Sequence, residues 1–328
     1  MQCQYSNAYE PKLLGVRTDS EDLTPDIYLY SFNHMPQNLP LPFSYSFEHP
    51  ASVQGSCNGL VCVTLNEGST IVLWNPATRQ FRPIRVPFVN AWFSDMSTTF
   101  GFGFLPDEND YKVVRIPLRK SNSTPVSVYS LGSDSWRAIR VAVPDMTFRL
   151  GAVSVNGFLH WLAYQLKEIE LIVSFDLRNE VFQQMAMPDS CGFDYEIKRE
   201  IVVLKGSLSV IVYSAPLTAG NSFEIWVMTE YGLQESWTKK FTIGTFSTTV
   251  WPVGVWSTGE IIFEYLNHCS HELFLYDSSS QEIEYFPTHG YMHFFRVFDY
   301  VESLVSVSGG RKRSCRTFSF MADYRRCA

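Results

Sequence analysis

Two short stretches of the chain carry side chains that could bind a metal ion. His268, Cys269 and His271 offer the nitrogen and sulfur ligands that zinc accepts, and the run DEND at residues 107–110 offers the oxygen ligands that calcium prefers. A structural zinc site needs four ligands, and no Cys-x-x-Cys pair or second histidine pair completes the first set. Polar turns between strands account for both stretches, so we expect no metal ion and no cofactor.

Residues that could catalyse a reaction are scattered along the sequence. His160 lies beside Trp161 in an apolar run, where a strand residue is expected rather than a general base. Gly101 and Gly103 lack the third glycine and the following helix of a dinucleotide-binding fingerprint. The segment SDSW at residues 133–136 does not recur, which leaves little support for hydrolase chemistry. We therefore predict no catalytic residues, and we expect that the protein is not an enzyme.

The residues best suited to hold a partner are aromatic. Phe88, Trp92 and Phe93 lie between Pro87 and Met96, in a segment that follows a strand-like run and is expected to be a loop. Loops on a rigid scaffold often carry binding residues, and tryptophan is common among the side chains that anchor interfaces. Packing between neighbouring sheets is the alternative for these rings. We predict Phe88, Trp92 and Phe93 as candidate partner-binding residues.

One strand-turn-strand pattern recurs along the chain and must position these residues. In its clearest copy, Asn58-Gly59 precedes the apolar run LVCV, and the run IVLW at residues 71–74 stops at Asn75-Pro76. Asn-Gly tolerates positive φ and Asn-Pro ends a strand, so the segment reads as turns between β-strands. An aromatic residue lies near the end of the equivalent strand in every copy, at intervals of 44 to 55 residues. The six residues are Tyr30, Trp74, Tyr129, Phe175, Trp226 and Tyr276.

A repeat of roughly 40–50 residues made of short strands is typical of a β-propeller. We predict an all-β, kelch-like propeller over residues 11–308 with six blades; seven stay open, because the weak copy at residues 201–243 has room for another hairpin. Residues 294–307 look like inner strands without an outer half, and residues 12–32 look like outer strands with too few inner ones. We expect the two ends to pair in one blade, because this closes the ring and removes free sheet edges.

Composition and charge exclude several classes of function. Hydrophobic residues make up 45% of the 328 residues and charged residues 18%, which suits a strand-rich protein with a large core. The net charge of −7 argues against a nucleic-acid partner, which would need a concentrated basic face. No apolar run is long enough to span a bilayer, and the first residues lack a secretory signal, so we expect no membrane partner.

Cysteine usage and the carboxyl-terminal segment bear on location. Seven cysteines at irregular spacing are a poor framework for disulfides, so we expect reduced thiols and a cytoplasmic and/or nuclear location. The basic residues Arg311, Lys312, Arg313 and Arg316 lie in the tail, residues 309–328. We expect this tail to be disordered rather than to act as a nuclear-import signal.

Six motifs, in order, resemble the plant F-box-associated domain. They are NGLVC at residues 58–62, LWNPATR at 73–79, GFGF at 101–104 with DYKVV at 110–114, VYSL at 128–131 with DSWR at 134–137, NG at 156–157 with HW at 160–161, and EIWVM at 224–228 with Trp237. The segment YVESLV at residues 300–305 is similar to the closing strand of that family. The resemblance covers residues 11–307 and is to the S-locus F-box and F-box/kelch-repeat proteins of flowering plants.

The resemblance implies a function. In that family an amino-terminal F-box docks on the Skp adaptor of a cullin-based ubiquitin ligase, and the propeller recruits the target protein to be ubiquitinated and degraded, in one branch during self-incompatibility. The sequence before Lys12 shows no F-box, so we expect binding to the Skp adaptor and cullin only if an F-box is supplied. The alternative is a propeller enzyme or a glycan-binding, lectin-like protein, which would need acids or a metal at the channel mouth.

Overall fold

The computed structural model describes residues 12–18, 25–31, 35–43, 51–87, 98–118, 125–165, 169–188, 197–214, 222–267, 270–286 and 293–308. Strands dominate this part of the chain, with two short 3-10 turns, η1 (Asn66–Gly68) and η2 (Gln234–Ser236). Nothing in the described ranges forms a helix of the length and apolarity needed to cross a bilayer. The predicted tail, residues 309–328, lies outside the described residues.

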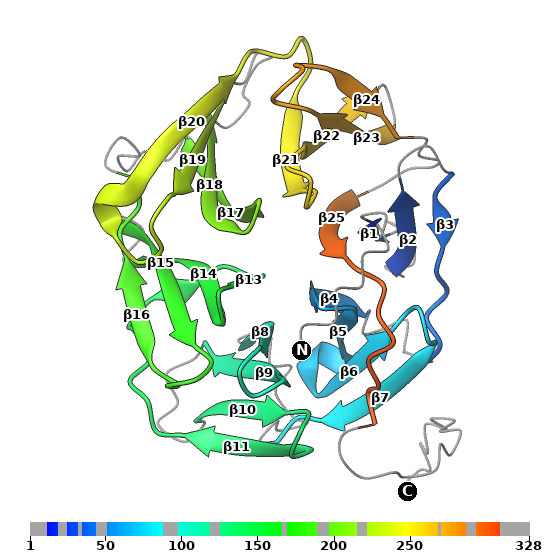
Figure 1. Ribbon diagram of the computed structural model, residues 1–328, viewed down its shortest axis with the longest axis vertical. Coiled ribbons are helices and arrows are strands. Elements are labelled where there is room, and N and C mark those ends of the chain that lie inside the picture. Colours follow the sequence, from blue (N-terminus) through cyan, green and yellow to red (C-terminus); the bar gives the residue numbers. More distant parts are fainter. Residues whose placement is uncertain are drawn as a thin grey trace, which may run out of the picture.

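Six antiparallel sheets stand around a central axis as the blades of a propeller (Figure 1), so the predicted fold and blade number are confirmed. From the centre outward, blade 1 contains β25 (His293–Tyr300), β1 (Lys12–Thr18), β2 (Pro25–Ser31) and β3 (Gln37–Asn38), and blade 2 contains β4 (Ser52–Cys57), β5 (Leu60–Leu65), β6 (Thr70–Asn75) and β7 (Gln80–Arg85). Blade 3 contains β8 (Thr98–Leu105), β9 (Asp110–Pro117), β10 (Val126–Ser130) and β11 (Ser135–Ile139).

The remaining blades follow the same order. Blade 4 contains β13 (Val153–Val155), β14 (Phe158–Gln165), β15 (Ile169–Asp176) and β16 (Phe182–Met185), with β12 (Thr147–Phe148) also paired to β14. Blade 5 contains β17 (Ile197–Leu204), β18 (Ser207–Ser214), β19 (Phe223–Met228) and β20 (Trp237–Ile243). Blade 6 contains β21 (Val250–Val255), β22 (Ile261–Asn267), β23 (Ser270–Tyr276) and β24 (Ile283–Tyr285).

The sequence repeat corresponds to one position in each blade. All six aromatic residues that define the repeat lie on the third strand from the centre, from Tyr30 on β2 to Tyr276 on β23. Two-residue turns join the first and second strands of blades 2, 4 and 5, at Asn58-Gly59, Asn156-Gly157 and Lys205-Gly206, and both residues of each turn have positive φ. These turns match the right-handed twist of the flanking strands, which explains the recurrence of Asn-Gly.

The two ends of the described chain close the ring in blade 1, as expected. Strand β25 pairs with β1 in antiparallel register, with Leu14 opposite Phe298 and Lys12 opposite Tyr300. One detail of the prediction is wrong. Residues 294–307 supply one inner strand rather than several, because the chain leaves the sheet after Tyr300. The outer strand of blade 1 is β3, which comes from a proline-rich part of the chain.

Residues 301–308, which we call the strap, run from blade 1 across blade 2 (orange-red in Figure 1). Asn75, fully buried at the end of β6, donates from Nδ2 to the carbonyl oxygens of Ser303 at 3.0 Å and Val305 at 2.7 Å. Arg82 on β7 donates to the Val307 carbonyl oxygen at 3.1 Å. The asparagine of the Asn-Pro turn therefore fastens the carboxyl-terminal strap to the blade.

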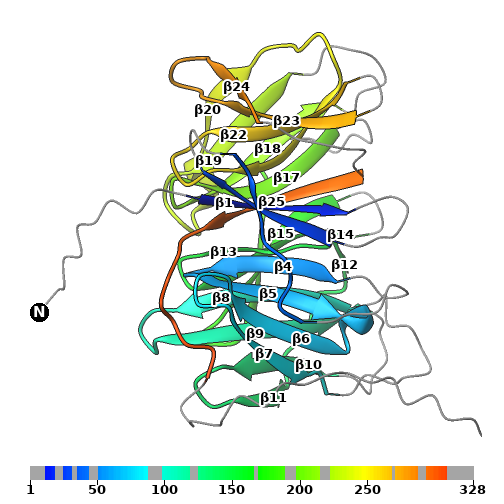
Figure 2. The same ribbon diagram turned by 90° about the vertical axis from the view of Figure 1, so that its right-hand side faces the viewer.

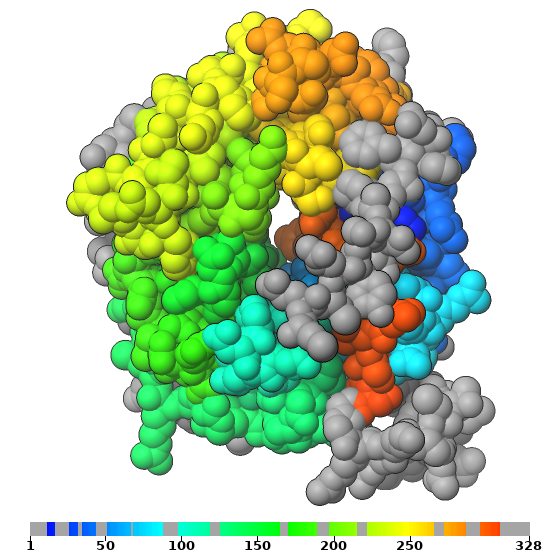
Figure 3. Space-filling view, viewed as in Figure 1, coloured from blue at the N-terminus to red at the C-terminus, as the bar shows by residue number. Residues whose placement is uncertain are grey.

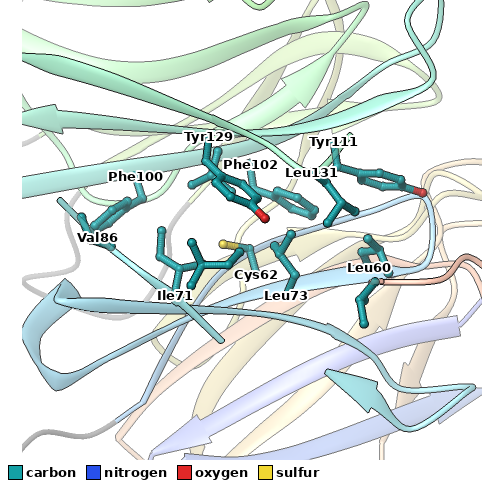
Figure 4. Close-up of a cluster of buried hydrophobic side chains, with 13 residues drawn as sticks. Leu60, Cys62, Ile71, Leu73, Val86, Phe100, Phe102, Tyr111, Tyr129 and Leu131 are labelled. Carbon is teal, nitrogen blue, oxygen red and sulfur yellow. The ribbon is translucent and has the colours of Figure 1, made fainter. Parts of the chain in front are cut away.

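The core lies between neighbouring blades. Figure 4 shows one such layer, in which side chains of blade 2 face side chains of blade 3. Its labelled members are Leu60, Cys62, Ile71, Leu73, Val86, Phe100, Phe102, Tyr111, Tyr129 and Leu131. Cys57 and Cys62 are free thiols, as expected, and burial raises the pKa of Cys57 to about 11.

The glycines of β8 allow blade 4 to approach blade 3. A Cβ atom on Gly101 would lie 2.6 Å from Trp161 Cζ2 and 2.7 Å from Leu159 Cδ1, and one on Gly103 would lie 2.9 Å from Leu177 Cδ1. Glycine at position 101 therefore leaves room for the Trp161 ring of the next blade.

Gly101→Ala should destabilise the protein by about 1–3 kcal/mol, because the added methyl group overpacks the layer between blades 3 and 4. The matched control is Gly244→Ala, at an exposed glycine where an added Cβ meets no heavy atom within 4 Å. Chemical denaturation of both variants is the measurement. Equal midpoints for the two variants would contradict the close approach.

Asn75→Ala should cost roughly 1–3 kcal/mol, because two strap carbonyl groups lose their buried donor and the Thr78 amide of the turn loses its acceptor, Asn75 Oδ1. Leu304→Ala in the same strap is the control, since its side chain is 89% exposed and should change stability by less than about 0.5 kcal/mol. Hydrogen exchange of the strap amides should rise in the first variant alone. An unchanged exchange rate there would show that Asn75 does not hold the strap.

Candidate functional site

The propeller has two faces that differ in what they carry. The inner strands begin at one face, which also receives the connections between blades, and we call it the start face. They end at the other, which carries turns such as Asn58-Gly59 together with the strap, and we call it the strap face. In Figure 2 the start face lies on the right and the strap face on the left.

The predicted partner-binding residues Phe88, Trp92 and Phe93 lie outside the described residues. The described chain stops at Pro87, after β7, and resumes at Thr98, where β8 begins. Both flanking positions belong to the start face, at the connection between blades 2 and 3. The role of the three rings in binding stays a prediction.

The acidic run at residues 107–110 forms the turn between β8 and β9, as the sequence indicated. Asp110 accepts hydrogen bonds from Ser130 Oγ at 2.6 Å and from the Gly132 amide at 2.8 Å, and Glu108 pairs with Lys112 at 2.9 Å. These carboxylates are thus used by neighbouring protein groups. Within the described ranges, no group of three or more His, Cys, Asp or Glu residues could hold a metal ion. His268 and Cys269 lie outside those ranges.

His160 is a strand residue on β14, as predicted. Its side chain is fully buried between blades 4 and 5, with Nε2 2.8 Å from the Tyr231 hydroxyl oxygen. Burial lowers the pKa of His160 to about 4, because the apolar surroundings disfavour the charged ring. A neutral, inaccessible ring joins two blades rather than reaching a substrate.

A charged network, missed in the sequence, lies at the start-face end of blades 4 and 5. Arg149, which follows β12, donates to the Arg199 carbonyl oxygen at 2.7 Å and to Glu200 Oε1 at 2.9 Å. Glu170 on β15 lies 3.0 Å from Arg199 Nη1 and 3.8 Å from Arg149 Nη1. Arg199 is 3% exposed whereas Arg149 is 37% exposed, so the network extends from between the blades to solvent.

Arg296 faces this network from the other side of the channel. It lies on β25 of blade 1, and its Nη1 is 3.8 Å from the position of a Cβ atom on Gly151 in blade 4. Blades 1 and 4 stand opposite each other in the ring of six, so the side chain reaches across the axis. Figure 3, which views the strap face, shows the hollow at this axis, with β21 and β25 on its wall.

Protein atoms partly replace water around Arg296 and Glu200. Burial lowers the pKa of Arg296, Glu200 opposes the shift, and the like charge of Arg149 adds to it. Burial also raises the pKa of Glu200, which its contact with Arg149 opposes. Two features of the sequence could have revealed the site: the charged run KRE at residues 198–200 inside an apolar strand, and Arg296 between Phe295 and Val297.

The arrangement is suited to binding rather than to proton transfer. Its accessible arginines are permanent cations, and guanidinium groups recognise carboxylate or phosphate groups by paired hydrogen bonds. We therefore take Arg149, Glu200 and Arg296, supported by Glu170 and Arg199, as the candidate functional site.

Comparison with known proteins adds an independent result. Residues 26–307 match the family model described as F-box associated beta propeller domain. The chain is 32% identical over 222 residues to F-box protein At3g07870 of Arabidopsis thaliana, covering 59% of this chain and 51% of the relative. It is 28% identical over 239 residues to F-box/kelch-repeat protein At3g23880 of the same plant, covering 70% and 64%. The matched region thus spans about half to two thirds of these relatives.

Solved structures show the fold alone. A mutant of AofleA from Arthrobotrys oligospora superposes with a TM-score of 0.50 at 8% sequence identity, covering 90% of this chain and 91% of that one. So low an identity carries no information on ligands, because propellers of one architecture serve many functions.

The depressed pKa of His160 predicts an acid-sensitive fold. The unfolded ring takes up a proton near pH 6.5 and the folded ring only near pH 4. The free energy of unfolding is therefore at its full value above pH 6.5 and decreases as the pH falls from 6.5 towards 4. The loss should reach about 3 kcal/mol. An NMR titration should find the His160 ring still neutral at pH 5, and a midpoint near 6.5 would contradict the buried position.

Proposed function

Because the chain belongs to the F-box associated β-propeller family, we propose that it is the substrate-recognition module of a cullin-based ubiquitin ligase. The observation that carries the proposal is the extent of the family match, which runs from β2 in blade 1 to the strap and so includes all six blades. A relative named as an F-box protein and another named as an F-box/kelch-repeat protein support the same assignment.

The geometry fits a receptor that binds and positions another protein. The ring is closed, and the chain leaves one blade and enters the next at its start face, where changes disturb the core least. The charged network of Arg149, Glu200 and Arg296 lies on this face at the channel. We propose that the protein works without catalysis of its own and delivers the bound target to the ubiquitin-transfer machinery.

The partners follow from this role. The target protein binds the propeller, whereas the Skp adaptor and cullin bind through an F-box, so we propose that the propeller alone captures the target and not the adaptor. We further propose that it works in the cytoplasm or the nucleus and extend the proposal to self-incompatibility, the pathway of one branch that the sequence resembles. If a plant line that lacks the protein still rejects pollen normally, the proposed role in self-incompatibility is wrong.

Affinity purification from plant extract tests the proposal with three baits: this chain, the chain preceded by the F-box of a relative, and that F-box alone. We expect the first two baits to recover a common target, and the last two to recover the Skp adaptor and cullin. The reconstituted complex of the second bait should ubiquitinate the captured target. The proposal fails if the chain enriches no protein beyond the F-box control, or if the captured protein is not ubiquitinated.

A further inference from the structure

Arg296 is a cation in a protein-lined channel, and among the described residues the carboxylate that attracts it, Glu200, is already hydrogen-bonded to Arg149. Arg296 is exposed, and it makes no hydrogen bond or ion pair to another described residue. Surrounding protein nevertheless desolvates the guanidinium, as the lowered pKa shows. A charge that has lost part of its hydration without gaining a partner is costly, so a bound anion would stabilise it.

The two nearby carboxylates are already used. Glu200 accepts from Arg149 at 2.9 Å, and Glu170 accepts from Arg199 at 3.0 Å. Among the described residues of this network, three arginines face two glutamates, which leaves one positive charge unmatched in a chain whose net charge is −7. The excess positive charge is local. It lies where Arg149 and Arg296, on opposite blades, repel each other.

The second arginine is held in position. Arg149 is fixed by the Arg199 carbonyl oxygen and by Glu200, and Arg199 is fixed by Glu170 between the blades. A guanidinium that is already oriented loses little conformational entropy when it binds a ligand. Gly151 opposite Arg296 has no side chain, and a Cβ atom there would lie 3.8 Å from Arg296 Nη1, so a larger residue at this position would contact the guanidinium.

We propose that the start-face mouth of the channel binds a single anionic group, a carboxylate or a phosphate, carried by an extended segment of the target protein, with Arg296 as its direct ligand and Arg149 beside it. That the group belongs to a target protein rests on the proposed function. A polyanion such as nucleic acid fits less well, because its affinity comes from many phosphate contacts and the site has one unbalanced charge.

The test uses the purified chain and four probes: inorganic phosphate and the tripeptides acetyl-Ala-phosphoserine-Ala-amide, acetyl-Ala-Glu-Ala-amide and acetyl-Ala-Ser-Ala-amide. Binding is measured by isothermal titration or by NMR shifts at low salt. The variants are Arg296→Gln, which removes the charge at nearly constant size, Arg296→Lys, which keeps it, and Arg140→Gln, a control at an exposed arginine on blade 3. Thermal unfolding checks that all three remain folded.

We expect inorganic phosphate and at least one anionic tripeptide to bind more tightly than the serine tripeptide, and Arg296→Gln to weaken that binding about tenfold by removing a charge-assisted contact. Arg296→Lys should lose less, and Arg140→Gln nothing. Binding of the phosphoserine tripeptide alone identifies phosphate as the group, and binding of the glutamate tripeptide identifies carboxylate.

Equal binding of the three tripeptides, or equal losses in Arg296→Gln and Arg140→Gln, overturns the proposal. None of these measurements involves the adaptor, the cullin or ubiquitin. Failure of the anion site is thus separate from failure of the ligase role, which the affinity purification tests.

Discussion

The antiparallel pairing of β25 with β1 is the constraint on which the rest of the structure depends. It joins the two ends of the described chain within one sheet, with Lys12 opposite Tyr300, and gives blade 1 its inner strand. Without it the ring would have an open seam with unpaired strand edges. Each blade is flanked by two neighbours only when the ring is closed, and the apolar layers between blades require both. The strap extends the closure to blade 2 through Asn75.

Charged side chains serve different purposes on the two faces. On the strap face they connect neighbouring blades: Lys112 donates to the Leu177 carbonyl oxygen at 3.0 Å, Arg82 pairs with Asp134, and Arg137 pairs with Glu180. Exposed ion pairs contribute little to stability, although each of these contacts joins two neighbouring blades. At the start face, Arg296 makes no hydrogen bond or ion pair to another described residue. This imbalance among the described residues is the basis for the anion site that we propose.

The way the blades are held together bears on the proposed function. The blades are held by fully buried apolar layers and by groups such as His160 that are neutral because they are buried. In the function that we propose, the surface that binds the target is carried by this closed scaffold. Groups that the fold has already oriented would lower the entropic cost of that binding.

The sequence by itself determined the propeller repeat, the turns and the closure of the ring, whereas the tertiary structure decided between six blades and seven. These features are encoded locally, because strand alternation, Asn-Gly turns and one aromatic residue per third strand are visible within a single repeat. Only the tertiary structure decided that residues 301–308 form a strap: β25 is the innermost strand of blade 1, with its free edge at the channel, and the chain then crosses blade 2 instead of adding a strand at that edge. The channel site was also decided there, because Arg149, Arg199 and Arg296 come from blades 4, 5 and 1 and meet only when the ring closes.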